Sequence, residues 1–190
     1  MINKWIDDQH YSGISYLEKR LTQTEFNNCT FQNCDFSKAD LSESDFVNCQ
    51  FEECNFAMVL LHGTGIKNVL FTGCKLIGAG FDNCSDFLFS ARFQKCGLDY
   101  ASFVAKKIRQ TRFEDCSMKE VDFSDADLSL AVFENCDLQN AVFSNTNIEK
   151  ADFRSAYNYS INPEANRIKK ARFSFPGIGG LLEKYHIEIE

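Results

Sequence analysis

Cysteine is the residue type with the most obvious chemical potential in this sequence. The chain has nine cysteines among 190 residues, enough for several disulfides or a metal site. No two of them have the Cys-x-x-Cys spacing of zinc ligands and redox dithiols, and an odd number is typical of reduced thiols. All of them fall at one position of a five-residue unit, where Ala and Thr replace them, so we interpret them as small buried hydrophobes: Cys29, Cys34, Cys49, Cys54, Cys74, Cys84, Cys96, Cys116 and Cys136.

Histidine is the second candidate for chemistry, as a general base or a metal ligand. The chain has three histidines, His10, His62 and His186, and none is close in sequence to another plausible catalytic group. We therefore expect solvated or packed imidazoles. No glycine-rich phosphate loop, metal spacing or nucleophile with a base stands out. An enzyme with a site near His62 and Asp86 is the least favoured hypothesis, and the sequence favours a non-enzymatic binding protein without a cofactor or metal.

The cysteines belong to a repeat with a period of five. A large apolar residue occupies every fifth position from Phe113 to Phe153, and a small or compact residue lies two positions before each of them. This period matches neither the 3.6 residues of a helical turn nor the two-residue alternation of a flat strand. Each unit must therefore be a short extended piece followed by a corner, and the chain is a repeat protein.

The order of the large residues gives the number of units in a turn. The units from Phe26 to Leu61 spell Phe-Phe-Phe-Leu twice, which is a period of twenty residues, and from Phe93 to Phe153 Phe alternates with Leu, Ile or Met. Like residues stack only if four units make one turn. We predict an all-β solenoid with four sides, in which Phe ladders and aliphatic ladders stack at about 4.8 Å per turn.

Two stretches depart from the repeat. The register slips by two residues between Phe81 and Leu88, so we expect a bulge or loop near residues 84–88, with Leu88 as the next large core residue. Two glycines in Leu61–Gly65 suggest a bent or strained turn. Either stretch is a tolerated surface insertion or a bend that shapes a binding face. Only Asp86 and Lys106 occupy small-residue positions without being small.

The two ends of the chain are expected to close the solenoid. Residues 1–21 form an N-terminal cap or a degenerate first coil, because Tyr11, Tyr16 and Leu21 keep the register; a short amphipathic segment is the alternative. The β-helix is expected at residues 22–157, with no repeat after Phe153.

Residues 158–190 are predicted to be a capping and dimerisation module. Arg167–Phe175 indicates a strand-like basic connector, Pro176 can start a short helix, and the last four residues alternate as in a strand. A solenoid needs its last turn covered, so this segment is expected to be a cap. The same cap can also pair with a second copy of the chain. The predicted dimer contacts are Ile178, Leu181, Leu182, Tyr185, Ile187 and Ile189.

Charge is unevenly distributed along the chain. The formal net charge is −7 and the pI about 5.0, which argues against direct binding to nucleic acid. Residues 21–60 hold 7 acids and 1 base, residues 61–112 hold 3 acids and 8 bases, and residues 113–152 hold 10 acids and 2 bases. Many Asp residues follow the repeat, which prefers Asp or Asn just before the large residue. Five acids elsewhere in the unit are the candidate partner-binding acidic face: Glu114, Asp115, Glu120, Asp125 and Glu134.

A solvated acidic face is the plain alternative for these residues. The basic belt of Lys106, Lys107, Arg109 and Arg112 interrupts the acidic stretches and has no explanation in the sequence. No apolar run has the length of a membrane span, and the first residues lack the pattern of a signal peptide. We therefore expect a soluble cytoplasmic protein without membrane contact.

The repeat units resemble those of the pentapeptide-repeat family. Ala126–Leu130 (Ala-Asp-Leu-Ser-Leu) and Ala151–Ser155 (Ala-Asp-Phe-Arg-Ser) carry the resemblance, which extends from about Thr24 to Ala156. It implies a right-handed quadrilateral β-helix. The tail, Ile168–Pro176 with Leu181-Leu182 and Ile187–Ile189, resembles the C-terminal module of the topoisomerase-protecting branch, which includes Qnr-type quinolone-resistance and albicidin-resistance proteins.

This resemblance implies a function. Members of that branch are rod-shaped homodimers, joined through their C-terminal helices, that imitate duplex DNA and dock on DNA gyrase or topoisomerase IV, inhibiting the enzyme or protecting it from poisons. Members with long projecting loops use them in drug protection, whereas this chain has only the two-residue slip near Asp86. A pentapeptide-repeat interaction scaffold without a topoisomerase role is the alternative function.

Overall fold

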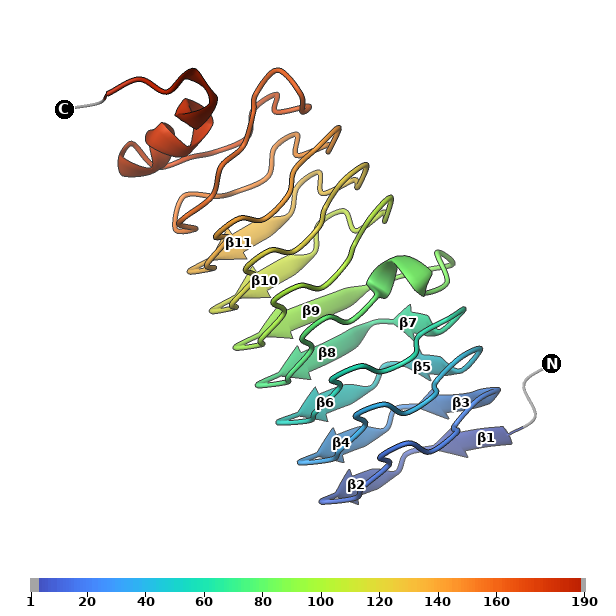
Figure 1. Ribbon diagram of the computed structural model, residues 1–190. Coiled ribbons are helices and arrows are strands. Elements are labelled where there is room, and N and C mark those ends of the chain that lie inside the picture. Colours follow the sequence, from blue (N-terminus) through green and yellow to red (C-terminus); the bar gives the residue numbers. More distant parts are fainter. Residues whose placement is uncertain (1–3, 189–190) are drawn as a thin grey trace.

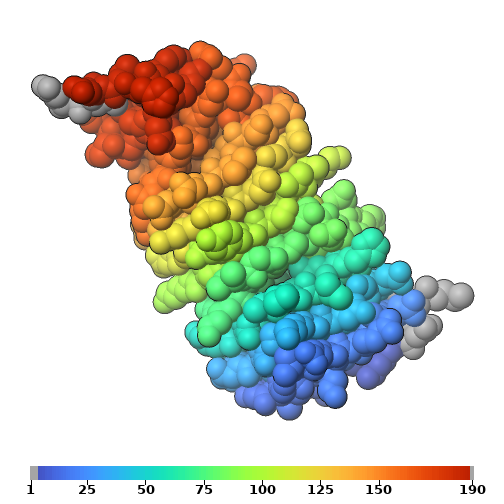
Figure 2. Space-filling view, in the orientation of Figure 1, coloured from blue at the N-terminus to red at the C-terminus, as the bar shows by residue number. Residues whose placement is uncertain are grey.

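Each five-residue unit becomes one side of a rectangular coil in the computed structural model, which describes residues 4–188. The coils stack into a rod whose N-terminal and C-terminal ends lie at opposite tips (Figure 1). In the space-filling view successive segments of the chain form parallel bands along this rod (Figure 2). The fold is a parallel β-helix with the four sides that the period of twenty predicts, and it is right-handed, as the resemblance of the repeat units implies.

Two faces of the rod are parallel sheets. The first face contains β1 (Lys4–Asp7), β3 (Thr24–Asn27), β5 (Asp45–Val47) and β7 (Gly65–Lys67). The second face contains β2 (His10–Ser12), β4 (Thr30–Gln32), β6 (Gln50–Glu52), β8 (Val69–Thr72), β9 (Ala91–Gln94), β10 (Arg112–Glu114) and β11 (Val132–Glu134). Most neighbours pair residues one coil apart, as in Phe26 with Phe46 and Phe31 with Phe51.

The other two faces are held by single bridges between coils. The third face is the row Ser15, Asp35, Asn55, Lys75, Gly97, Ser117, Asp137 and Tyr157. The fourth face contains the row Arg20, Asp40 and Leu60 and the row Gly80, Ser102, Asp122 and Val142. The bridged residue is the one just before the large core residue, so its side chain points outward.

A corner in the left-handed region turns the chain from one face to the next. The residue two positions after the core residue has a positive φ in nearly every unit, for example Asn28 at 52° and Asp125 at 59°. Asn, Asp and Gly adopt this conformation most readily. The Asp or Asn before the core residue also supports the corner, since Asp35 Oδ1 accepts a hydrogen bond of 3.0 Å from the N–H of Ser37. This local bond explains the repeat's preference for Asp and Asn at that position.

Stacked rings fill much of the core. On the second face the rings follow one another with centroid distances of 4.6 to 5.3 Å: Tyr11, Phe31, Phe51, Phe71, Phe93, Phe113, Phe133, Phe153 and Phe173. The fourth face changes from Leu21, Leu41 and Leu61 to a second aromatic ladder that starts at Phe81 and ends at Phe143. The predicted mixture of Phe and aliphatic ladders is confirmed.

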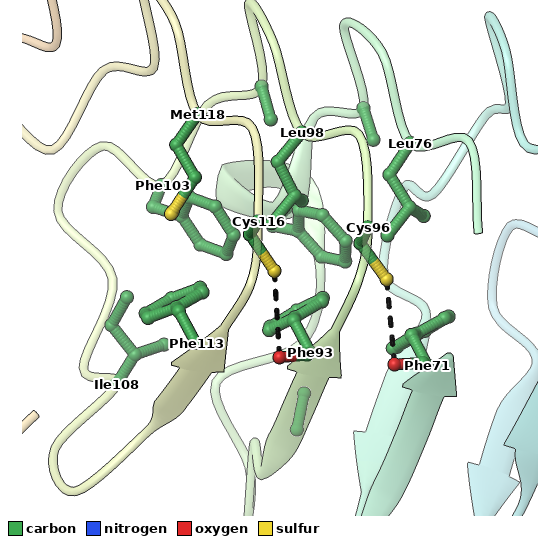
Figure 3. Close-up of a cluster of buried hydrophobic side chains, with 14 of the residues drawn as sticks. Phe71, Leu76, Phe93, Cys96, Leu98, Phe103, Ile108, Phe113, Cys116 and Met118 are labelled. Atoms are coloured by element: carbon green, nitrogen blue, oxygen red, sulfur yellow. Dashed lines mark hydrogen bonds between the residues drawn. The ribbon is translucent and has the colours of Figure 1, made fainter. Parts of the chain in front are cut away.

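The cysteines lie in the core beside these ladders and all are buried and unpaired. Seven of the nine thiols donate weak hydrogen bonds to backbone carbonyls of the preceding coil, as Cys96 does to Phe71 at 3.5 Å and Cys116 to Phe93 at 3.6 Å (Figure 3). Thr64 Oγ1 makes the equivalent bond to the carbonyl of Leu41 at 2.9 Å. The small-residue position therefore holds a compact side chain, and Cys or Thr there can also donate a hydrogen bond.

The register slip lies where the sequence predicts it, but Leu88 is not a core residue. Phe71 pairs with Phe93, twenty-two residues on, so this coil has two extra residues. Leu88 is 66% exposed and occupies a corner with φ 58°, whereas Phe89 packs against the core. Leu88 and Phe89 are both large and apolar, and either could fill the inward position. Because Leu88 forms the corner, Phe89 points inward. The 3-10 helix η1 (Phe81–Asn83) precedes this insertion, and the first-face sheet ends at β7.

The glycine-rich stretch Leu61–Gly65 keeps the regular path. Thr64 is buried in the small-residue position and Gly65 pairs with Asp45 in register within the first-face sheet. Gly63 has φ 66°, which is the ordinary corner conformation of this fold. The expected bend at this stretch is therefore not present.

Regular coils extend beyond both expected limits of the repeat. Near the N-terminus β1 pairs with β3 and β2 with β4, so residues 4–21 form a coil. Near the C-terminus Arg167 bridges Asn147 and Arg172 bridges Asp152, while Ile168 and Phe173 pack against the core. The expectation that the repeat ends after Phe153 is wrong: residues 158–166 disturb the spacing, and the segment expected to be a connector is a further coil.

The C-terminal helix is present in a tighter form than the spacing predicts. It consists of two 3-10 helices, η2 (Pro176–Leu181) and η3 (Glu183–Tyr185), which cover the last coil (Figure 1). Leu181 and Leu182 are half-buried and Ile178 and Tyr185 are exposed, so no single apolar face forms as in an α-helix. Three glycines in η2 disfavour the α-helix. The described part of the predicted last strand, at Ile187, is not a strand, and Ile189 lies outside the described residues.

Candidate protein-binding surface

The five acids predicted to share one face lie on different sides of the rod. Glu114 and Glu134 are register neighbours on the second face. Arg112, on the same face, lies 3.6 Å from Glu114 Oε2 and makes a closer ion pair with Glu134. The arginine compensates part of their negative charge, so these two carboxylates are poor candidates for an anionic surface.

The other three predicted acids occupy corners. Asp115 turns the chain from the second to the third face, and its carboxylate accepts a hydrogen bond of 3.1 Å from the amide of Asn135. Glu120 and Asp125 lie at the two edges of the fourth face. Glu120 accepts a hydrogen bond of 3.3 Å from Tyr100, and Asp125 one of 2.6 Å from Asn145. Both partners are neutral, and within residues 4–188 neither carboxylate forms an ion pair, so both keep their charge uncompensated.

The fourth face is the side of the rod on which negative charge gathers. We define it as residues 39–43, 59–63, 79–83, 101–105, 121–125 and 141–145 together with the corner residues 58, 78, 100, 120 and 140. This set contains no Lys or Arg. Its acids are Asp40, Glu43, Asp82, Glu120, Asp122 and Asp125. Within the described chain, Arg20 of the preceding coil is paired with Asp40 at 3.5 Å.

Sequence reasoning missed four of these acids. Asp40 and Asp122 occupy the position just before the large residue, where the repeat itself prefers Asp or Asn. Both support corners: Asp40 accepts a hydrogen bond of 3.1 Å from the N–H of Ser42, and Asp122 accepts one of 2.8 Å from the N–H of Ser124. The hydrogen bonds from Ser42 hold the pKa of the Asp40 carboxyl below its ordinary value. Each carboxylate therefore supports its corner and remains an outward-facing charge. Writing the sequence in rows of twenty would have placed all six acids in neighbouring columns.

The basic belt lies away from the fourth face. Lys107 and Arg109 are on the first face, where Lys107 bridges Asp127. Arg112 is on the second face, and the side chain of Lys106 is buried in a small-residue position of the core. The belt interrupts the acidic stretches along the sequence but adds no cation to the fourth-face residues defined above. The bases next to this set are Arg20, paired with Asp40, and Lys38, which begins the same corner row as Met58 and is paired with Glu18 at 3.5 Å.

The repeat of this chain is similar to that of known proteins. A sequence model described as the pentapeptide repeat region matches residues 19–103, 64–143 and 85–173. The chain belongs to the pentapeptide repeat family. No protein of curated function matches this pentapeptide repeat protein in sequence.

This chain is similar to several solved structures. A trypsin-treated form of QnrB1, described as a plasmid-mediated fluoroquinolone resistance protein, is 20% identical, with 98% of this chain and 100% of that chain covered and a TM-score of 0.50. A second trypsin-treated form of QnrB1 is 23% identical over 97% of this chain and 99% of that chain, with a TM-score of 0.48. HetL, a pentapeptide repeat protein involved in heterocyst differentiation regulation from the cyanobacterium Nostoc sp. strain PCC 7120, is 16% identical over 90% and 88%, with a TM-score of 0.33.

The C-terminal end of the pentapeptide repeat protein carries exposed apolar side chains. Phe175 is 89% exposed, and Ile178, Tyr185 and Ile187 are also exposed, although Leu181 and Leu182 are half-buried. Lys184 and the hydroxyl of Tyr185 both bind the carboxylate of Glu164, the latter at 2.9 Å. The bond with Lys184 lowers the pKa of Glu164. These polar contacts hold η3 against the last coil, while Phe175, Ile178 and Ile187 face solvent outside η3.

The candidate catalytic residues of the pentapeptide repeat protein do not form a site. His62 lies on the fourth face, whereas the Asp86 carboxylate pairs with Lys106 of the next coil. Among residues 4–188 no three side chains of His, Cys, Asp or Glu come together as metal ligands would. No helix in that part of the chain has the length and apolar character that a membrane span requires.

Proposed function

We propose that this protein binds DNA gyrase or topoisomerase IV through its fourth face, as a non-enzymatic imitation of duplex DNA. By occupying a DNA-binding surface it would inhibit the enzyme or protect it from topoisomerase poisons. One observation carries the proposal: six carboxylates and no Lys or Arg lie on one side of the rod between residues 39 and 145. A protein surface built to hold DNA is cationic, so these carboxylates are complementary to it.

The number of negative charges per unit length of the fourth face agrees with that of duplex DNA to within a factor of two. The coils of Asp40 and Asp122 are four coils apart, or roughly 20 Å at the spacing of paired strands. Duplex DNA carries about twelve phosphate charges over that length, against six carboxylates here. Three of them, Glu120, Asp122 and Asp125, lie in a single coil. The choice of a topoisomerase as partner rests on the resemblance of the C-terminal segment, and the description of QnrB1 as a fluoroquinolone resistance protein agrees with it.

We further propose that residues 158–190 join two copies of the rod. The exposed apolar side chains there need a partner, and the interface would include Ile178, Leu181, Leu182, Tyr185, Ile187 and Ile189 of the predicted set together with Phe175. A protein with this task acts in the cytoplasm, where its target enzymes are. Leu182→Asp, or the fully solvated Phe175→Asp, should give a monomer in light scattering; a dimer retained by both variants would refute the interface.

DNA supercoiling by purified gyrase tests the proposed function. Increasing amounts of the protein should inhibit supercoiling or rescue it from a gyrase poison. The double variant Glu120→Lys, Asp125→Lys should weaken this effect by about tenfold or more, because two desolvated charges at an interface are reversed. The matched control Glu114→Lys, Asp115→Lys changes the net charge equally on the second face and should retain the effect.

The outcomes separate the alternatives. Equal loss in both double variants would mean that overall charge, and not the fourth face, decides binding. No change in either would remove the acids from the mechanism. No effect of the wild-type protein on gyrase or on topoisomerase IV, with or without a poison, would select the alternative of an interaction scaffold without a topoisomerase role.

A further inference from the structure

The fourth face has an open hollow in its acidic surface. Two rows of outward residues lose their side chains at the same level: Gly78 lies between Met58 and Tyr100 along the corner, and Gly80 lies between Leu60 and Ser102 along the face. The resulting hollow has a volume of about 560 Å³. Its lining includes Met58, Leu60, His62, Gly78, Gly80 and Asn83.

The lining is apolar and reachable from solvent. Met58 is 69% exposed and Leu60 57% exposed, while the core residues Val59 and Leu61 form the floor. Gly78 has φ 67°, and a Cβ built there would meet no atom within 4 Å. The missing side chain of Gly78 therefore leaves real space beside two large exposed apolar groups, whereas at Gly80 the amide of Asn83 lies 2.8 Å from the Cβ position. Such groups are common binding anchors when they gather with space between them.

Carboxylates border this hollow. A Cβ built at Gly80 would lie 3.2 Å from Asp82 Oδ1, which places that carboxylate at the rim. The Asp82 carboxylate accepts a hydrogen bond of 3.3 Å from the side-chain amide of Asn83. Glu43 follows the lining residue Ser42, and its carboxylate accepts a hydrogen bond of 3.0 Å from Gln23. Within residues 4–188 neither carboxylate forms an ion pair.

The ammonium of Lys38 does not cancel the negative charge of this rim. Lys38 precedes Met58 in the same corner row, and its ammonium is paired with Glu18 at 3.5 Å, one coil farther from the hollow. The rim therefore keeps a negative potential around an apolar centre. A nucleic acid or an anionic lipid headgroup would be repelled here, whereas a cationic protein segment would be attracted.

We propose that this hollow receives one apolar side chain from a partner protein segment in which Lys or Arg flanks that side chain. The apolar group packs between Met58 and Leu60, and the flanking cations meet Asp82 and Glu43. The unbranched Met58 side chain can adapt to the entering group. The inference deepens the proposed function, since it lies on the same fourth face and names the chemistry of the partner segment, which a pure imitation of DNA would not require.

Methionine methyl NMR tests the hollow without any topoisomerase. The chain has three methionines; Met58 lines the hollow, and Met118 is fully buried and serves as an internal control. The probe is a five-residue peptide in which one leucine is flanked on each side by two lysines. Its addition should shift the Met58 methyl signal saturably and leave Met118 unchanged. Peptides with alanine in place of leucine, or glutamate in place of lysine, should bind at least about tenfold more weakly.

Variants of the hollow provide the second measurement. Leu60→Gln removes an apolar wall, and Gly78→Asn fills the space with a residue that tolerates positive φ. Each should weaken binding of the leucine peptide, and of gyrase where gyrase binds, by about tenfold. Ile77→Gln is the control for an exposed apolar residue on the third face. Gly13→Asn is the control for the backbone, since Gly13 has φ 65° and open space at another corner.

Each outcome decides one question. A Met58 shift that is absent, or equal for the leucine and alanine peptides, would overturn the hollow as a binding site. Gyrase binding that is lost with Glu120→Lys, Asp125→Lys but unchanged with Leu60→Gln and Gly78→Asn would leave the proposed function standing and reject the hollow's part in it. A specific peptide response without any gyrase binding would support the hollow and reject the topoisomerase as partner.

Discussion

The ammonium of Lys106 lies 2.8 Å from the carboxylate of Asp86 in the preceding coil. The lysine side chain is only 2% exposed, whereas that of Asp86 is 68% exposed. Lys106 Nζ also donates a hydrogen bond to the carbonyl of Cys84 and lies 5.4 Å from the ring centroid of Phe89. Lys106, which occupies a small-residue position of the core, is thus the partner of an exposed Asp86 in the insertion, and the two meet where the insertion interrupts the first-face sheet.

Replacing Lys106 should destabilise the protein according to what is lost. Lys106→Met keeps the volume but leaves the Cys84 carbonyl without its donor, which costs about 1–3 kcal/mol. Lys106→Ala also leaves a cavity, so we expect a loss of about 2–5 kcal/mol. Urea unfolding measures both. The neighbouring Lys107→Met is the control and should change stability by no more than about 0.5 kcal/mol; a Lys106→Met protein as stable as the wild type would contradict the role of the ammonium.

The fold follows from the sequence because the repeat encodes it at every level. The period of twenty fixes which residues stack and gives four sides, and the alternation of Phe with aliphatic residues independently requires an even number of sides. Local choices between similar residues do not follow. Leu88 and Phe89 are both large and apolar, and only the corner geometry around them decides which one points inward.

The candidate surface was harder to predict than the fold. Counting acids along the chain mixes all four faces, because five consecutive residues cover one side and the next five cover another. Glu114 and Glu120 are six residues apart but lie on different faces, whereas Asp82 and Asp122 share a face across forty residues. The neutralisation of Glu114 and Glu134 by Arg112 depends on side-chain positions, which the repeat pattern does not contain.

The cysteines should be unreactive in the folded protein. All nine are buried, and burial raises the pKa of Cys49 to about 12. A raised pKa keeps the thiol protonated at pH 8, and the thiolate is the reactive form. With an aromatic disulfide reagent at pH 8 we expect reaction only at the rate of unfolding, and nine reactive thiols in denaturant. Rapid modification of the native protein at that pH would show that the solenoid opens locally.

Acid should destabilise the rod through its corner aspartates. Hydrogen bonds from Ser37 lower the pKa of Asp35 below its ordinary value of 3.8. A carboxyl with a lowered folded pKa adds stability above its unfolded pKa, and this stability is lost as the pH falls through the folded pKa. Asp35→Asn keeps the acceptor for the corner, as Asn55 does in the next coil at 3.1 Å from the N–H of Ala57.

Thermal unfolding of Asp35→Asn between pH 7 and pH 2 gives the comparison. We expect the variant to be less stable than the wild type at pH 7 and the difference to shrink below about pH 4, where the unfolded carboxyl is protonated. A difference that stays constant over the whole range would mean that the ionised form of Asp35 has no special stabilisation.

The hydroxyl of Tyr159 is buried beneath η2, and no group within residues 4–188 forms a hydrogen bond with it. An unpaired buried hydroxyl costs free energy, so Tyr159→Phe should stabilise the protein by about 1 kcal/mol. The same hydroxyl explains why residue 177 is glycine, because a Cβ built at Gly177 would lie 2.2 Å from it. Gly177→Ala should therefore destabilise the wild type but cost less in the Tyr159→Phe background. Urea unfolding of the two single variants and the double variant gives the coupling, which we expect to be at least about 0.5 kcal/mol; strictly additive effects would place the Gly177 constraint elsewhere, for example at the Ser174 hydroxyl, 3.0 Å from the same Cβ position.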